Sequence, residues 1–362
     1  MKMTIQQQTL KEAFDTISKF RGKGLLQHIH LSATEDLTFR ATDGDVTYVK
    51  RVALSDKENI EIAGDLLLPP KFEEVVRKLS SGPITIEVME NGQIEIKQAP
   101  KTKVKVNGVE SELPGIPDHE KSDGIALTTE VLSKLVSSTS FAASDKDSRP
   151  ILKAIHMESD DKSFKVVATD SHRLSQMLIP KPFKIPKMNI PAKRLADVIS
   201  TLEEKQPLTL IPAGSHLIIQ TSDRDIYIRL LEGEYPALER LIVCDSKLKI
   251  TVGRKNVLSA IDRALTFAKD EKHRSITLEP KDSVLLIYSS TDDTGSIEEE
   301  MEAKIEGEVS KFTINAKFAI DSLKAFASDD VTFHIQGPEK PIFIFSEKEP
   351  TLTQLVLPIR TT

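Results

Sequence analysis

The chain has 362 residues, a net charge of −6 at pH 7 and a single cysteine, Cys244. One cysteine excludes an intrachain disulfide, and no stretch approaches the roughly 18 to 20 apolar residues that a membrane-spanning helix needs. The first residues lead into polar sequence without the apolar core of a signal peptide, so we expect a cytoplasmic protein. The acidic net charge, taken alone, argues against a nucleic-acid partner.

Apolar residues spaced three and four positions apart predict six amphipathic helices. In chain order they cover residues 8–23, 71–79, 129–141, 193–205, 254–272 and 317–326. Alternating apolar and polar residues predict strands between them, among others at 29–31, 37–39, 46–49, 155–157, 164–167 and 276–278. Helices and hairpin-joined strands in this order favour an α+β fold with sheets on one side and helices on the other.

A helix-start segment occurs three times, and its lysine recurs as Lys71, Lys193 and Lys317, after 122 and then 124 residues. A second marker, Ala-Thr-Asp-Gly-Asp at 41–45, returns as Ala-Thr-Asp-Ser-His at 168–172 and more faintly at 290–294. A period near 120 residues is too long for a solenoid repeat and has the size of a domain. We therefore expect three similar domains, residues 1–121, 122–247 and 248–362, joined by linkers containing Pro and Gly.

The charges are unevenly distributed between the predicted helices and the remainder of the chain. The helices carry net charges of +2, +1, 0, 0, +2 and +1, so the remainder carries −12. One interpretation is a basic surface made of helices with an acidic surface elsewhere. The other is that Lys and Arg are simply good helix formers.

The cluster that most resembles an enzyme site is Asp170, Ser171 and His172, which supplies an acid, a hydroxyl and an imidazole. A hydrolase is therefore one hypothesis. Neighbours in an extended segment point to opposite faces, however, and cannot easily form a nucleophile relay. Asp43 occupies the same position in the first repeat, which favours a turn role for the aspartate and no catalytic residue.

Metal and cofactor sites are not indicated by the sequence. There is no phosphate-binding loop, no paired-His helix motif and no Cys pair with zinc spacing. His28 and His30 could share a strand face as metal ligands. His30 matches His156 and then Thr277 across the repeats, however, so a structural position is the better interpretation. We expect no metal and no cofactor.

Four segments, at 148–152, 168–174, 232–236 and 357–360, resemble the bacterial beta sliding clamp family, the processivity subunit of the DNA polymerase III holoenzyme. The resemblance spans the chain and implies a DNA clamp fold: three similar domains, each with two helices on one side and antiparallel sheets on the other, in a ring-forming homodimer. Family members usually carry Gly where Ser171 stands and often Met near Ile359. The chain therefore resembles a somewhat divergent member, either a main or a secondary clamp.

The resemblance implies a non-enzymatic clamp that encircles duplex DNA without reading sequence. It would tether the replicative polymerase, the clamp loader and repair proteins through short linear motifs bound in a groove. The alternatives are the hydrolase using Asp170 and His172, and a repeat scaffold that binds only protein.

The resemblance also implies three sets of site residues. The partner-peptide groove would comprise Leu152, Thr169, Ser171, His172, Arg173, Leu174, Pro236, Arg240, Leu241, Asn315, Phe318, Val356, Leu357, Pro358, Ile359 and Arg360. Basic residues toward DNA would be Arg21, Lys23, Lys71, Lys146, Arg149, Lys193 and Lys317. The dimer interface would join Lys103, Val104, Lys105 and Val106 on an outer strand to Phe267 and Ala268 on a helix of the third domain.

Overall fold

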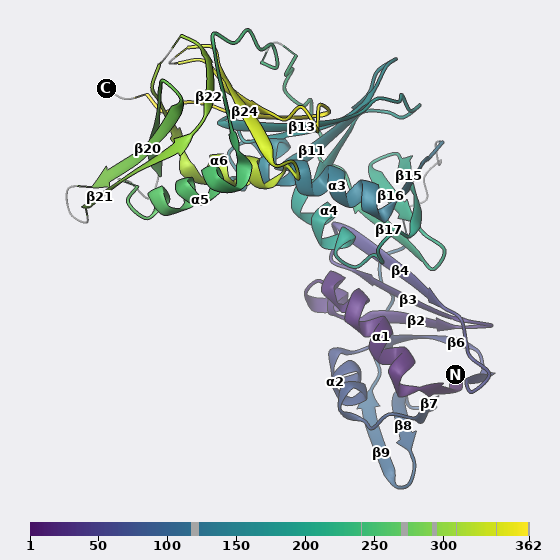
Figure 1. The fold of residues 1–362 in the computed structure, drawn as a ribbon. Helices are drawn as coiled ribbons and strands as arrows, with labels where there is room; N and C mark the ends of the chain where they lie inside the picture. Colours follow the sequence, from purple (N-terminus) through teal and green to yellow (C-terminus); the bar gives the residue numbers. More distant parts are fainter. Residues whose placement is uncertain are drawn as a thin grey trace. The chain divides into compact units, whose positions relative to one another are not determined.

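The computed structural model describes residues 1–116, 123–239, 241–268, 274–291, 295–308, 310–337 and 339–360. The chain divides into two compact units (Figure 1). Unit 1 contains residues 1–130 and 197–230, and unit 2 contains residues 131–196 and 231–362. Within the described ranges, no helix is both long and apolar enough to span a bilayer.

Unit 1 begins with a five-stranded antiparallel sheet. Its strand order is β5 (Asn59–Ile62), β1 (Lys2–Gln6), β7 (Pro83–Val88), β8 (Gln93–Gln98) and β9 (Thr102–Asn107). Helices α1 (Gln7–Ile17) and α2 (Pro70–Lys78) pack against each other. Phe14 of α1 meets Phe72 of α2 edge to face, with ring centroids 6.4 Å apart. Strand β9 ends the sheet and leaves one of its edges without a neighbour among the described strands.

The second sheet of unit 1 joins segments that lie far apart in the chain. Its order is β10 (Ile125–Thr128), β15 (Pro207–Ala213), β16 (His216–Gln220), β17 (Arg224–Arg229), β4 (Val46–Val52), β3 (Leu37–Thr42), β2 (Ile29–Ala33) and β6 (Gly64–Leu68). Strand β17 pairs with β4 in the register Arg224 to Lys50. We call this pairing the first seam.

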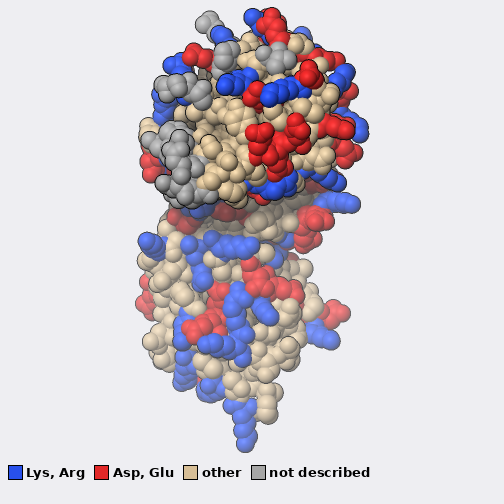
Figure 2. All heavy atoms as spheres, turned by 60° about the vertical axis from the view of Figure 1, so that its left-hand side comes forward, with Lys and Arg blue, Asp and Glu red and all other residues tan. Residues whose placement is uncertain are grey.

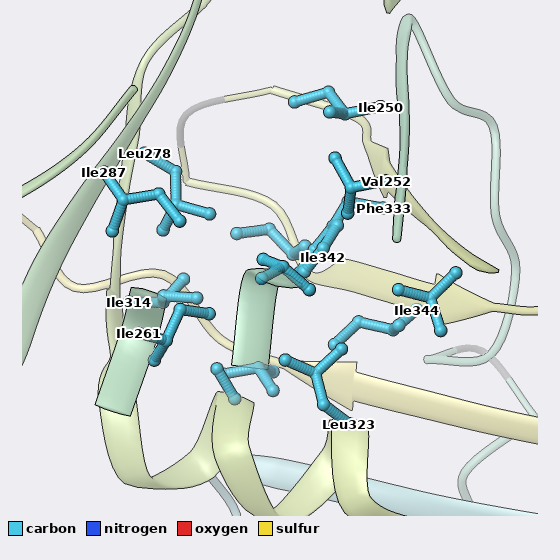
Figure 3. Packing of buried hydrophobic residues seen from close by; sticks show 14 of the residues in the cluster. Ile250, Val252, Ile261, Leu278, Ile287, Ile314, Leu323, Phe333, Ile342 and Ile344 are labelled. Atoms are coloured by element: carbon cyan, nitrogen blue, oxygen red, sulfur yellow. The ribbon is translucent and has the colours of Figure 1, made fainter. Parts of the chain in front are cut away.

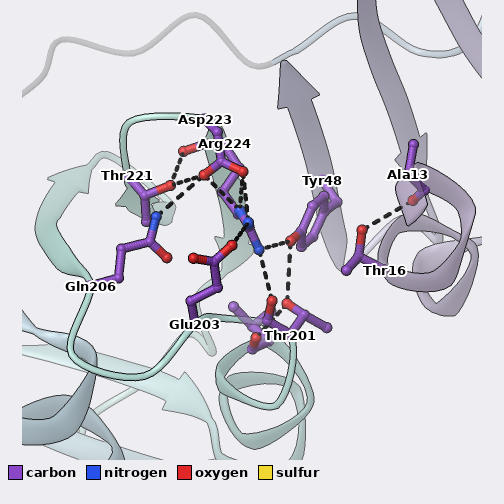
Figure 4. A network of polar contacts seen from close by, with 10 residues as sticks. Ala13, Thr16, Tyr48, Thr201, Glu203, Gln206, Thr221, Asp223 and Arg224 are labelled. Atoms are coloured by element: carbon purple, nitrogen blue, oxygen red, sulfur yellow. Dashed lines mark hydrogen bonds and ion pairs between the residues drawn. The ribbon is translucent and has the colours of Figure 1, made fainter. Parts of the chain in front are cut away.

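A buried polar network closes the first seam (Figure 4). Arg224 is only 2% exposed, and its guanidinium donates to the Thr201 carbonyl at 2.7 Å and to the Tyr48 hydroxyl at 3.3 Å. It also pairs with the Asp223 carboxylate at 2.6 Å. A buried charge is tolerated only when its donors are satisfied, and this network satisfies them.

Unit 2 contains a nine-stranded antiparallel sheet that also joins distant segments. Its order is β14 (Met188–Pro191), β11 (Ala154–Ser159), β12 (Phe164–Thr169), β13 (Arg173–Ile179), β26 (Leu352–Val356), β25 (Ile342–Phe345), β24 (Asp330–Ile335), β18 (Leu248–Gly253) and β22 (Lys304–Gly307). Strand β13 pairs with β26 in the register Arg173 to Val356. We call this pairing the second seam.

Unit 2 also contains a four-stranded sheet and helices. The sheet order is β21 (Gly295–Glu302), β20 (Val284–Thr291), β19 (Ser275–Lys281) and β23 (Phe312–Asn315). Helices α5 (Arg254–Leu265) and α6 (Ala316–Lys324) pack side by side, and α3 (Thr129–Thr139) begins at the unit boundary. Helix α4 (Ala192–Ile199) crosses from unit 2 into unit 1.

The core of unit 2 follows from the alternation of its strands (Figure 3). Alternate residues of β19, such as Ile276 and Leu278, are buried and meet Ile261 of α5 and Leu323 of α6 in one apolar cluster. Side chains alternate across a strand, so one face is packed while the other meets solvent. The predicted α+β class with antiparallel sheets is confirmed, and the six strand segments predicted above lie in β2, β3, β4, β11, β12 and β19.

The predicted far ends of two helices are wrong, and a third helix is shorter than predicted. Helix α1 stops at Ile17 and continues only as a short 3-10 turn to Phe20, because Arg21 is extended and Gly24 has a φ of +61°. Helix α4 ends at Ile199 rather than 205, and a turn follows in which the N–H groups of Thr201 and Leu202 donate to the carbonyls of Val198 and Ile199. Helix α5 ends at Leu265, and residues 266–268 are not helical. The rest of the predicted helix, residues 269–272, lies outside the described residues. With these bounds the six helices carry a total charge of +4 rather than +6.

Candidate functional site

The hairpin turn at residues 169–173, between β12 and β13, is held by its own polar groups. The Asp170 Oδ1 accepts hydrogen bonds from the backbone N–H groups of His172 and Arg173, at 2.9 and 3.0 Å. The Thr169 hydroxyl donates to the Arg173 carbonyl at 2.6 Å and accepts from the Ser171 N–H at 3.2 Å. Ser171 adopts a φ of +77°, which few residues other than glycine take.

The segment at 357–360 follows β26 and lies against this turn. The Leu357 N–H donates to the His172 carbonyl at 2.9 Å, and the Ile359 N–H donates to the Thr313 carbonyl at 2.8 Å. Leu357 is 36% exposed although its own backbone N–H and that of Ile359 are both hydrogen-bonded. We call residues 169–174 and 357–360 together the turn–tail surface.

Arg173 is committed to contacts within unit 2. Its Nε lies 2.9 Å from Asp170 Oδ2 and its Nη1 lies 2.7 Å from Asp321 Oδ2. The guanidinium also stacks over the rings of Phe318 and Phe141, at 4.4 and 5.5 Å from their centroids. A cation over two rings and between two carboxylates is held firmly, so Arg173 fixes the turn against α6.

An apolar cluster supports the turn–tail surface from below. Leu174, Val167, Leu238, Phe343 and Leu355 are buried together, with Tyr235, Ile242 and Cys244 packed against them. The Tyr235 hydroxyl accepts a hydrogen bond from the Thr169 N–H at 3.1 Å, and burial raises the pKa of that hydroxyl well above its usual range. The segment that contains Tyr235 is therefore anchored to the turn.

The predicted groove residues fall into three groups by exposure. Leu152, Thr169, Leu174 and Val356 are buried, and Arg173, Asn315, Phe318, Pro358 and Ile359 are half-buried. Ser171, His172, Pro236, Leu241, Leu357 and Arg360 are exposed, and Arg240 lies outside the described residues. The buried members can support a surface from beneath but cannot themselves touch a partner.

The structure brings together most of this set through named contacts. The turn contacts Leu357 and Phe318 as described, and the Asn315 side chain caps α6 by accepting from the Phe318 N–H at 3.1 Å. No hydrogen bond, ion pair or ring contact joins Leu152, Pro236, Leu241 or Arg360 to the turn within the described ranges.

Sequence reasoning missed Phe141, Asp321 and Val243. Phe141 and Asp321 hold Arg173, and Asp321 stands three positions after Phe318 on one face of α6, a spacing that could have indicated its role. Val243 is 66% exposed beside the buried cluster, and its alternation with half-buried Ile242 and Cys244 was the available signal.

The turn role predicted for the aspartate is confirmed. Asp43 Oδ1 accepts the N–H groups of Asp45 and Val46 at 3.0 and 2.9 Å, the same arrangement that Asp170 makes. Both Asp170 oxygens are occupied by the turn backbone and Arg173 rather than by the His172 ring.

The histidines singled out as possible metal ligands have other partners. His28 Nδ1 lies 2.8 Å from the Leu25 carbonyl, and His30 Nε2 lies 3.3 Å from Asp65. His156 Nδ1 lies 2.7 Å from Asn189 Oδ1, and its ring stacks on Tyr235. In the part of the chain that the structure describes, no group of three potential metal ligands occurs.

The basic residues predicted to face DNA differ in whether they form ion pairs with described residues. Arg21 pairs with Glu73 at 2.9 Å, and Lys71 pairs with Glu74 at 2.9 Å. Lys71 and Lys78 hold the pKa of the Glu74 carboxyl at about 2. The others are exposed and form no ion pair with any described residue: Lys23, Lys146, Arg149, Lys193 and Lys317.

The predicted interface residues lie on one edge strand and in one turn. Lys103, Val104, Lys105 and Val106 belong to the edge strand β9. The sequence predicted that Phe267 and Ala268 belong to a helix, and this prediction is wrong. They lie in a turn after α5, whose N–H groups donate to the Ala264 and Leu265 carbonyls at 3.1 and 3.2 Å.

Comparisons with known proteins identify the family. Residues 126–237 match the family model for the DNA polymerase III beta subunit, central domain, and residues 239–360 match the model for its C-terminal domain. The beta sliding clamp of Bacillus subtilis is 30% identical over 380 aligned residues, covering all of both chains. The chain belongs to the beta sliding clamp family. The clamp of Staphylococcus aureus is 28% identical over 88% of this chain and 85% of its own.

Solved clamp structures agree with this assignment. The sliding clamp of Bacillus subtilis superposes with a TM-score of 0.93 at 28% identity over all of both chains. The DNA polymerase III beta chain of Streptococcus pneumoniae gives 0.94 at 27% identity, over 99% of this chain and all of that one. The predicted clamp fold and the predicted function as a processivity clamp are confirmed, and the hydrolase and scaffold alternatives find no support.

Proposed function

We propose that two copies of this clamp close head to tail into a ring around duplex DNA and tether partner proteins without catalysing a reaction. The ring would contain six domains, three from each chain, bounded near residues 121 and 247. Work on bacterial DNA would place the protein in the cytoplasm. The observation that carries this proposal is that two of the four sheets contain strands from one end of the chain only and have not joined a second sheet across a seam.

Each seam within the chain is a continuous antiparallel sheet, of eight strands in unit 1 and nine in unit 2. The other two sheets have five and four strands and end in β9 and β21. An unpaired edge is a template for another strand. Pairing β9 of one copy with β21 of a second copy would create a third seam of nine strands, and a two-fold head-to-tail arrangement would close the ring.

The side chains of the two edge strands are complementary. On β9, Val104 and Val106 face the packed side, whereas Lys103 and Lys105 are exposed. On β21, Ile297 and Met301 face the packed side and Glu298, Glu300 and Glu302 are exposed. Figure 2 shows acidic side chains gathered on the end of unit 2 that carries β20 and β21. Opposite charges beside joined apolar faces favour this pairing.

The free basic residues support sequence-independent contact with phosphates. Lys23, Lys146, Arg149, Lys193 and Lys317 are exposed without an ion pair among the described residues, whereas Arg21 is held by Glu73. Lysine binds phosphate as a point charge and releases counterions from DNA. Binding to linear duplex should therefore be weak, sensitive to salt and indifferent to sequence.

The turn–tail surface supports the tethering role. Leu357 is 36% exposed, and half-buried Ile359 and exposed His172 adjoin it. Exposed apolar side chains supported by a packed cluster are typical of a protein-binding surface. We propose that a short linear peptide of the polymerase, the clamp loader or a repair protein places an apolar anchor here and polar groups near His172.

A charge exchange tests the ring. Lys103→Glu with Lys105→Glu should convert the dimer to monomer in sedimentation at moderate salt, because like charges would face each other across the third seam. Both lysines also lie near buried Glu95, at 2.8 and 4.0 Å, so circular dichroism must show that the variant remains folded. Adding Glu298→Lys and Glu300→Lys should restore the dimer. Protein loaded onto a nicked circle should remain bound in high salt and leave when the circle is cut. A charge-reversed chain that remains dimeric, or retention that survives cutting, would contradict the proposal.

A further inference from the structure

A hollow of about 660 Å³ lies between the nine-stranded sheet and the linker segment 233–239, entirely within unit 2. Its floor consists of side chains from β11, β12, β13 and β14. Tyr235 of the linker segment stacks on His156 of the floor, and the Asn189 side chain donates to the Gly233 carbonyl at 2.9 Å. We call this space the linker hollow.

The Gln176 side chain lines the linker hollow without a partner. Gln176 is 9% exposed, and its carboxamide forms no hydrogen bond with any described residue. It lies on the same face of β13 as Leu174, which packs with Leu238 of the linker segment. A buried carboxamide without a hydrogen bond is costly. Gln176 therefore marks a position where a bound group would complete the structure.

Unit 1 contains a corresponding hollow of about 640 Å³ beneath residues 108–115. His30 pairs with Arg40 across β2 and β3, in the way that His156 pairs with Val167 across β11 and β12. The sequence Ala-Thr-Asp follows both Arg40 and Val167. The floors of the two hollows are therefore built from matching positions of the repeat.

The floor of the hollow in unit 1 carries its own guanidinium. Arg40 donates to the carbonyls of Pro114 and Leu113, at 2.8 and 3.4 Å. Burial lowers the pKa of Arg40, and the charge of nearby Glu112 opposes this shift. The guanidinium thus lies under an acidic linker. Val167 stands at the matching position in unit 2 and supplies no cation.

The linker of unit 2 is nevertheless acidic. Glu234 and Glu239 line the linker hollow, are exposed, and form no ion pair with any described residue. A third carboxylate, Glu158, is already paired with Lys187 at 2.9 Å and with Lys165 at 3.6 Å. The linker hollow therefore offers two unpaired carboxylates and one unpaired carboxamide, whereas both of its lysines are paired.

We propose that the linker hollow binds a small organic cation, an alkyl guanidinium that takes the role that Arg40 has in unit 1. Its N–H groups donate to the Gln176 carbonyl oxygen and to the two unpaired carboxylates, while its alkyl chain packs on Val167 and Leu238. A guanidinium presents several donors in one plane and is weakly hydrated, so it suits a partly buried site with separate acceptors. The site belongs to a single chain and needs neither the ring nor the turn–tail surface.

Agmatine, an alkyl guanidinium, provides the probe. It is titrated into the full-length protein at fixed ionic strength, and methyl NMR follows Leu238 and Ile242, which line the hollow. We expect saturable shifts at both residues. Gln176→Leu should weaken binding at least about tenfold, because a buried hydrogen bond to a charged group is lost. Glu234→Gln with Glu239→Gln should weaken it about threefold or more.

Three further variants control for charge and for folding. Val167→Arg places a guanidinium on the floor, as Arg40 does in unit 1, and should prevent agmatine binding in a chain that circular dichroism shows to be folded. Gln176→Glu keeps an acceptor and should bind agmatine at least as tightly as the wild type. Glu308→Gln with Glu347→Gln removes the same charge from exposed positions outside the hollow and should leave the affinity unchanged.

Three results would overturn the proposal. Shifts that rise linearly with agmatine, or an equal loss of affinity in the control pair, would reveal only a general attraction to an acidic protein. Saturable binding that Gln176→Leu does not weaken would place the cation elsewhere and leave Gln176 to ordered water. No binding at all would refute the cation site while leaving the proposed ring and tethering role untouched. If Val167→Arg does not fold, the two Gln176 variants decide.

Discussion

The first and second seams share a backbone pattern but differ in what their side chains do. At the first seam, Arg224 is 2% exposed and joins Tyr48, Thr201 and Asp223 in a closed network. At the second seam, the guanidinium of Arg173 lies over Phe318, and its side chain retains 11% exposure beside the turn–tail surface. Arg224 lies opposite Lys50, at the end of the first seam away from the hairpin turn, whereas Arg173 lies opposite Val356, at the turn end of the second seam.

The exposed residues at the turn ends of the two seams also differ. Where the first seam carries the exposed charges of Asp45 and Arg229, the second carries His172 and Leu357. Exposed charges keep a strand junction solvated, whereas an exposed leucine beside a neutral turn favours association. Similar backbone repeats can therefore supply one structural joint and one binding site through a few side chains.

The largest expected effect comes from opening the first seam. Arg224→Met should destabilise unit 1 by about 3 kcal/mol, because it leaves Asp223 and the Thr201 carbonyl without their buried cationic partner. Urea unfolding of the full chain measures this loss. Arg229→Ala, an exposed change on the same strand, should alter stability by less than about 0.5 kcal/mol. Equal effects of the two variants would show that the buried network does not hold the first seam.

Truncation tests the turn–tail surface beside the second seam. Ending the chain before Leu357 should abolish peptide and polymerase binding, because it removes the apolar part of the turn–tail surface, and should leave dimerisation unchanged. Lys340→Ala, an exposed change outside the turn–tail surface, is the control and should retain peptide binding. If the truncated chain loses the folding transition of unit 2 in a thermal melt, residues 357–360 belong to the core rather than to a binding surface.

His172→Ala should weaken peptide binding by about 1 kcal/mol, the usual contribution of one hydrogen bond. Titration calorimetry with a partner peptide measures the change, and ester or nucleotide hydrolysis should remain at background in both chains. Asp45→Ala, at the equivalent position of the first seam, should not affect the peptide. An equal loss in both variants would show that the effect is not local to the second seam.

The smallest expected effect is the change in folding stability at acidic pH. Burial would raise the pKa of the Asp223 carboxyl, but hydrogen bonds and charge from Arg224 outweigh burial and leave that pKa below its ordinary value of 3.8. The ionised carboxylate therefore stabilises the fold above that ordinary value, and the contribution disappears as pH falls below it. The stability difference between the wild-type and Arg224→Met chains should narrow as pH falls from about 5 to about 3. A difference that stays constant would exclude the ion pair as its source.

Local sequence signals predicted much of this fold. Apolar spacing located all six described helices and the strands that carry the core, because both patterns depend on residues only a few positions apart. The turn role of Asp170 followed from its match to Asp43 across the repeats. The end of α1 was missed because extended Arg21 stops the helical segment before the apolar pattern ends.

The contacts of the site were harder to predict, because they depend on pairings over long sequence distances. Arg173 was expected to face a partner, yet it holds Asp321, a residue 148 positions away. The register of β13 with β26 decides which side chains meet Leu357, and no local pattern gives it. Ser171 was noted for its identity, but only the backbone angle gives that identity a physical consequence.

The mass of the protein in solution tests the ring most directly. A chain of 40.2 kDa that completes two seams by itself and the third with a second copy should sediment as a single species near twice that mass. The same mass should persist across micromolar concentrations. A species of 40.2 kDa at those concentrations would leave β9 and β21 unpaired and contradict the closed ring.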